Sequence, residues 1–90
     1  MPRYLVEAYV ADSPAAYAEV REQARRAALL GRDVNHVRTM FLPSDEVVLH
    51  LFEAPSIAAL RHAGRLAALH YERIVEAIEG DENPTKDDTR

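Results

Sequence analysis

The stretch of residues 46–57 constrains the fold most, because it combines a strand, a turn and the start of a helix. Its side chains alternate across an extended strand over residues 47–53. Pro55 disfavours helical geometry at the residue before it, and Ser56 can cap the helix that follows. The middle of the strand holds His50, where a packed core prefers Val or Ile. The stretch therefore predicts a strand that carries one titratable, metal-competent imidazole.

Similar patterns along the chain predict a complete βαββαβ order. Ser13 and Pro14 mark the start of the first helix, and Gly31 fits the position just past its end. The expected elements are strands over residues 3–10, 34–42, 47–53 and 72–78, with helices over 14–30 and from 57 onward. This order is typical of the ferredoxin-like α+β fold, a four-stranded antiparallel sheet with two helices on one face. We expect one such domain over residues 1–79 and a disordered polar tail over residues 80–90.

The composition narrows the classes of function. The formal charge of −4 argues against a nucleic-acid surface, which would need a basic patch. The arginines at 21, 25 and 26 alternate with Glu19 and Glu22, so they are interpreted as a solvated helix face. The chain has no cysteine and no apolar run of membrane-spanning length, and its start lacks the apolar core of a signal peptide. We therefore expect a soluble cytoplasmic protein without nucleic-acid or membrane partners.

The alternation also predicts which side chains the helices cover. One row of side chains in each of three strands is expected to face the helices: Val6, Ala8, Val10, Val37, Phe41, Val47, Leu49 and Leu51. The opposite face is expected to stay open and to mix polar with apolar side chains: Leu5, Glu7, Tyr9, His36, Arg38, Met40, Val48, His50 and Phe52. Such a face, beside a small alanine-rich core, predicts a homodimer in which a second subunit covers it.

Four residues of this open face form the predicted site. The first and third strands are central neighbours in this fold and the second flanks the third, so Glu7, Arg38 and His50 are expected to come close together. A carboxylate, a guanidinium and an imidazole on one semi-apolar surface could bind an anion, relay a proton or hold a metal. We predict that Glu7, Arg38 and His50 bind a ligand, and that Glu7, His36 and His50 are the metal ligands. The alternative is a hydrogen-bonded interface histidine beside a plain ion pair of Glu7 with Arg38.

Three segments of the chain carry a resemblance to a known family. They are residues 2–7, the block 44–56 with its Glu-Ala-Pro-Ser turn, and residues 69–76. Together they resemble a small bacterial family of ferredoxin-like proteins of uncharacterised function, which includes a nickel-binding protein. The resemblance implies a dimer with a divalent-metal site, so that nickel or another divalent ion would be the cofactor.

Individual positions can be compared within that resemblance. Glu7 is retained. Arg38 stands where the family often has histidine, with His36 two residues earlier. His50 stands where the family often has cysteine, and an imidazole preserves the capacity to bind a metal.

Three functions are open from the sequence. The first is a small dimeric binding protein that holds a divalent metal or a small anionic ligand on the open face. The second is a small dimeric enzyme of the monooxygenase, isomerase or cyclase type, with His50 as acid or base. The third is a structural or interaction module. No standard catalytic motif occurs and the three glycines form no phosphate loop, so no organic cofactor is implied and the binding protein is preferred.

Overall fold

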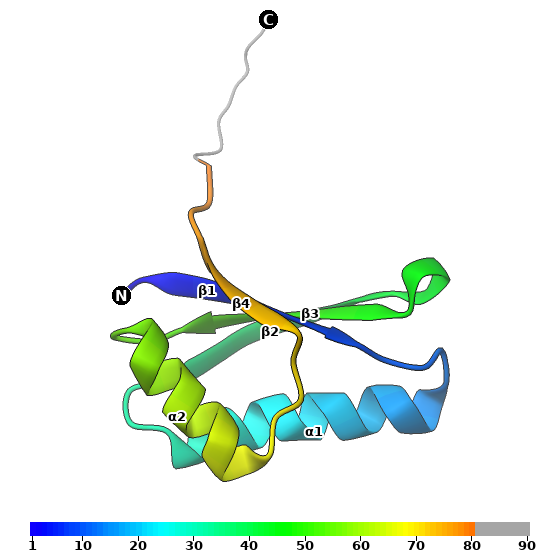
Figure 1. Cartoon of the computed structure of the whole chain (residues 1–90), viewed down its shortest axis with the longest axis horizontal. Coiled ribbons are helices and arrows are strands. Elements are labelled where there is room, and N and C mark those ends of the chain that lie inside the picture. The colour runs from blue at the N-terminus through cyan, green and yellow to red at the C-terminus, as the bar shows by residue number, and fades with distance from the viewer. Residues whose placement is uncertain (81–90) are drawn as a thin grey trace, which may run out of the picture.

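A computed structural model describes residues 1–80 and shows two layers, a sheet and a pair of helices. The elements are β1 (Arg3–Tyr9), α1 (Pro14–Leu30), β2 (Asn35–Leu42), the short 3-10 turn η1 (Pro43–Asp45), β3 (Val47–Glu53), α2 (Ile57–Ala67) and β4 (Arg73–Ala77). The sheet is antiparallel with the strand order β2-β3-β1-β4. Both helices cover one face of it (Figure 1), which confirms the ferredoxin-like α+β fold. The tail expected from residue 80 onward lies, from residue 81, outside the described residues.

The two predicted caps start the two helices. The Ser13 hydroxyl accepts a hydrogen bond from the Ala16 backbone N–H at 3.2 Å, and the Ser56 hydroxyl accepts one from the Ala59 N–H at 3.1 Å. Each bond satisfies an N–H group that the first helical turn leaves without a partner. No helix within residues 1–80 is long and apolar enough to cross a membrane.

Close packing, and not a left-handed turn, explains the glycine after α1. Gly31 has a φ of −85°, which any residue can adopt. A Cβ placed on Gly31 would lie 2.5 Å from the Cβ of Ala63 in α2. The end of α1 therefore approaches α2 more closely than a side chain would allow.

The core lies between the sheet and the helices in two apolar clusters. The larger cluster spans both helices and three strands: Tyr4, Val6, Ala24, Ala27, Val34, Phe52, Ala54, Leu60, Ala63, Ala67, Leu69 and Ile74. The smaller cluster holds Ala8, Val10 and Val48. His50 is also fully buried, with no exposed surface. It lies on β3 between Val48 of the smaller cluster and Phe52 of the larger one.

The orientation of β3 is opposite to the one expected from the sequence. Residues directly paired across antiparallel strands share a face, and His50 pairs with Val6, which the helices cover completely. The row of Val48, His50 and Phe52 therefore faces the helices, and the row of Val47, Leu49 and Leu51 faces away. The expectation failed because both rows are largely apolar. Burial of the neutral His50 ring is tolerated because one of its nitrogens finds a hydrogen-bond partner.

An irregularity in β2 also changes the face of the sheet on which part of that strand places its side chains. The pairing with β3 shifts register between His36 and Arg38, which is the mark of a β-bulge. His36 then pairs with Phe52, and Thr39 pairs with His50, so both lie on the helix-covered face. Arg38 pairs with Leu51 and stays on the open face. No turn or glycine signal in the sequence announces this bulge.

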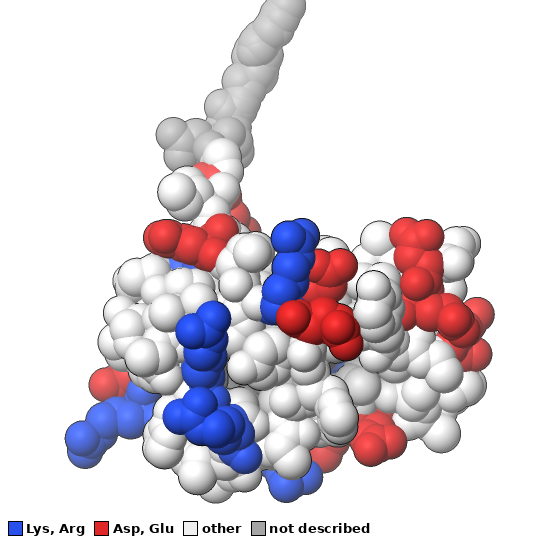
Figure 2. Space-filling model, viewed as in Figure 1, with Lys and Arg blue, Asp and Glu red and all other residues white. Residues whose placement is uncertain are grey.

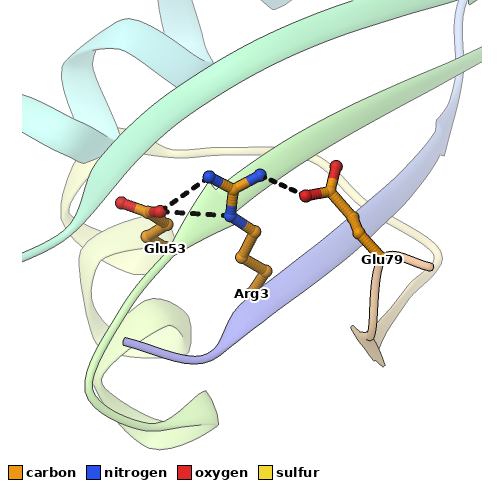
Figure 3. Close-up of polar contacts among 3 residues, drawn as sticks. All are labelled: Arg3, Glu53 and Glu79. Atoms are coloured by element: carbon orange, nitrogen blue, oxygen red, sulfur yellow. Dashed lines mark hydrogen bonds and ion pairs between the residues drawn. The ribbon is translucent and has the colours of Figure 1, made fainter. Parts of the chain in front are cut away.

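The open sheet face, defined as the side of the sheet away from the helices, is largely apolar and also carries ion pairs. Its apolar members are Leu5, Tyr9, Met40, Leu42, Val47, Leu49, Leu51, Val75 and Ala77. Glu7 pairs with Arg73 across β1 and β4 at 2.7 Å. Arg3 bonds Glu53 at 2.9 Å and Glu79 at 2.6 Å, so it joins three segments at one end of the sheet (Figure 3). This face is where the sequence predicts the dimer.

Candidate functional site

A chain of three polar side chains links the edge of the sheet to its buried interior. The Thr39 Oγ1 lies 2.8 Å from Nδ1 of His50 and 2.7 Å from Nε2 of His36. The β-bulge makes this chain possible, because it brings His36 onto the same face as Thr39. The ring centroids of His36 and His50 lie 5.9 Å apart, and the ring of Phe52 packs 5.2 Å from that of His36.

The Thr39 hydroxyl constrains the protons on both rings. It carries one proton and can donate it to one ring only, so the other ring must donate to Oγ1. The remaining nitrogen of His50, Nε2, is buried and has no hydrogen-bond partner among the described residues. His50 is therefore sealed from ligands in this arrangement. Of the two histidines, His36 is the one that keeps some exposure to solvent.

Both histidines are held in the neutral form. Burial, together with the charge that His36 would carry, lowers the pKa of His50 to about 4. Burial also lowers the pKa of His36, while a backbone hydrogen bond with Arg38 acts in the opposite direction. At neutral pH the three hydrogen-bonded side chains are therefore two neutral imidazoles and one hydroxyl.

His36 opens onto a groove between α1 and β2. The groove has a volume of about 380 Å³ and is lined by Ala18, Arg21, Glu22, Arg25 and His36. Arg25 makes a two-pronged ion pair with Glu22, with Nη2 2.9 Å and 3.0 Å from the two carboxylate oxygens. Arg21 has no ion pair or side-chain hydrogen bond within residues 1–80. With His36 neutral, the groove keeps one net positive charge in a chain whose formal charge is −4.

A larger hollow at another end of the molecule has the opposite character. It measures about 450 Å³ and is lined by Tyr9, Val10, Ala11, Asp45 and Glu46. Its charged side chains are both carboxylates, and Figure 2 shows acidic side chains gathered at the end of the molecule that holds η1. No buried titratable group lines it. The groove beside His36 is therefore the better candidate site.

The four residues predicted to share one pocket lie on two faces of the sheet. Glu7 and Arg38 lie on the open sheet face, whereas His36 and His50 lie under the helices. The prediction that they line one pocket on the open face is therefore wrong. The proposed metal set of Glu7, His36 and His50 is not brought together, and residues 1–80 contain no group of three or more metal-competent side chains. The expected pair of Glu7 with Arg38 is replaced by the pair of Glu7 with Arg73.

Sequence reasoning missed three contributors to this site. Thr39 was overlooked because a threonine in a strand usually signals nothing beyond a preference for extended backbone. Arg21 and Arg25 were interpreted only as a solvated helix face, although their spacing of four residues places them one above the other on α1. That spacing was the available signal, but it becomes informative only when β2 lies beside the helix.

The protein is therefore a small ferredoxin-like α+β domain with a polar groove between α1 and β2 as its candidate site. In structure, the chain is similar to the protein SCO4226 from Streptomyces coelicolor A3(2), with a TM-score of 0.72, 12% sequence identity, and coverage of 88% of this chain and 99% of that one. At this identity the likeness shows the shared fold. No protein-family model matches the sequence, and no curated protein is significantly similar to it.

Proposed function

We propose that this chain is a small homodimeric protein that binds a small anionic ligand in the groove between α1 and β2. One observation carries the proposal: two arginines and a half-buried neutral histidine line a single concavity of an acidic protein. Arginine offers a planar fork of N–H donors that matches a carboxylate or phosphate. The ligand therefore binds between α1 and the edge strand β2, and the open sheet face is left for the second subunit.

A divalent metal is supported less well by the geometry. Two imidazoles remain on one face, and both already share the hydroxyl of Thr39. The predicted third ligand, Glu7, is on the other face and is paired with Arg73. An enzyme that uses His50 as acid or base is also supported less well, because His50 Nε2 has no exposed surface.

Neutralising the groove arginines tests the anion site. In Arg21→Gln and Arg25→Gln, we expect the affinity for sulfate, measured by calorimetry near pH 6.5, to fall about tenfold or more, because each change removes a charge-assisted hydrogen bond. Arg26→Gln is the matched control, since it makes the same change on α1 outside the groove and should leave the affinity unchanged. Equal losses in all three variants would show that only the overall charge matters and would contradict the proposed site.

The homodimer is proposed on the composition of the open sheet face. Tyr9 is 69% exposed, Met40 is 42% exposed, and both lie on the same face as the partly buried Leu5 and Leu49. An apolar sheet face of this kind is unusual on a monomer of this size. The pair of Arg3 with Glu53 lies at one end of this face, as at the polar rim of an interface, whereas the pair of Glu7 with Arg73 joins the edge strand β4 to the central strand β1.

The assembly is tested by placing a charge on that face. We expect the parent chain to sediment as a dimer at micromolar concentration, and Met40→Glu to weaken the dimer by at least roughly a hundredfold, because two introduced carboxylates would be desolvated near each other. Leu29→Glu is the control, since Leu29 is 70% exposed on α1. A parent chain that stays monomeric, or a Met40→Glu variant that dimerises as well as Leu29→Glu, would refute this interface.

A further inference from the structure

His36 stands between the groove and the buried interior, and it is poised to change its charge. One side of its ring bonds the Thr39 hydroxyl, which leads to His50. The ring also lines the groove beside the two arginines. It is neutral in the free protein because burial disfavours the imidazolium. Burial therefore keeps the ring neutral, and Glu22, the one carboxylate in the groove, is already paired with Arg25.

We infer that the groove takes up an oxyanion together with one proton, and that His36 holds this proton. The inference rests on the proposed anion site and adds the protonation state and the class of ligand. An anion in the groove would supply the opposite charge that His36 lacks and would favour its charged form. The Thr39 hydroxyl can accept a hydrogen bond from the N–H of a protonated His36 and donate its own proton to Nδ1 of His50.

The groups that face His36 carry a net positive charge until an anion binds. From α1 these are Arg21, Glu22 and Arg25, and from β3 the group is His50. Glu22 is the only carboxylate that lines the groove, and its two oxygens are held by Arg25. A bound oxyanion would therefore be the one negative charge beside the ring that Arg25 does not already hold.

His50 is not the acceptor of the proton. Its Nε2 is buried without a partner, so a proton there would have neither water nor an acceptor. A charge on His50 would also lie close to a charge on His36, since the ring centroids are 5.9 Å apart. His50 instead acts as a positioning residue, which holds Thr39 and through it the ring of His36.

The ligand class follows from the donors in the groove. Arg21 offers a guanidinium without a partner among residues 1–80, and Arg25 and a protonated His36 add positive charge, which suits the oxygens of a carboxylate, sulfate or phosphate. Glu22, the one carboxylate of the groove, is held by Arg25. Sulfate is the suitable probe, because it keeps its charge throughout the range in which histidine titrates. Any change of affinity with pH then reports on the protein.

The experiment measures sulfate binding by calorimetry from pH 8 to pH 5.5, and near pH 7 in two cationic buffers of different ionisation enthalpy. We expect the affinity to rise by up to roughly tenfold per pH unit as the pH falls towards the pKa of free His36, which is the limit for uptake of one proton. The dependence on buffer should give an uptake that approaches one proton. Sulfate binding with no proton uptake would overturn the inference and leave the proposed anion site standing.

Two matched variants locate the proton. His36→Gln can still bond Thr39 but cannot become charged, so it should match the parent within about threefold at pH 8 and bind about tenfold more weakly at pH 6, with no proton uptake. His62→Gln, an exposed change on α2, should behave as the parent does. Unchanged uptake in His36→Gln would overturn the inference. Absence of sulfate binding by the parent at every pH would overturn the proposed function and, with it, this inference.

Discussion

Replacing Phe52 with alanine is expected to lower the free energy of unfolding by about 3–5 kcal/mol, measured by urea denaturation. Phe52 is the largest side chain that is fully buried, and it lies in the larger cluster opposite Tyr4. The loss combines the transfer free energy of the ring with the cavity that rigid neighbours leave unfilled. Because small domains are stable by only about 5–15 kcal/mol, the variant should be close to unfolding.

The packing around Phe52 also connects stability to the site. Its ring lies 5.2 Å from that of His36 and 6.1 Å from that of His50. Leu29→Ala is the control, since Leu29 is largely exposed on α1, and its effect should stay within about 0.5 kcal/mol. A loss below about 1 kcal/mol in Phe52→Ala would mean that the helices do not cover this face of β3 as described.

Acid should destabilise the protein through His50. Its pKa is about 4 in the folded chain, against an ordinary value of 6.5, so the unfolded chain binds more protons between these two pH values. Stability then decreases as the pH falls from 6.5 to 4, and the gap between the two pKa values corresponds to about 3 kcal/mol. Above pH 6.5 both states are neutral at this position, and His50 contributes no dependence on pH.

Urea denaturation of the parent chain and of His50→Gln at several pH values measures this contribution. Carboxylates titrate in both proteins, so the difference between their curves isolates the imidazole. We expect the decrease between pH 6.5 and 4 to be smaller by about 2–3 kcal/mol in His50→Gln than in the parent. His62→Gln, which removes an exposed histidine, should follow the parent. Parallel curves for the parent and His50→Gln would show that His50 is accessible to protons in the folded state.

The orientation of the third strand shows why the site could not be placed from the sequence. A strand buried on one face usually alternates apolar with polar residues, and that alternation selects the core row. In β3 both rows are apolar except for His50, so the histidine was taken to mark the exposed row. The structure buries it instead, since that row also holds Phe52 and since Thr39 satisfies one of the ring nitrogens.

The fold was determined by local signals that act within a few residues. The alternation in the strands, the serine caps at Ser13 and Ser56, and Pro55 together specify the order and type of the elements. The site was decided by contacts between elements that are remote in the sequence. The bulge at 36–38 turns His36 towards the helices, and the packing of α1 beside β2 brings Arg21 to it. Neither feature has a local signature in the sequence. The face on which His36 lies and the residues beside it are defined only when the sheet and the helices pack together.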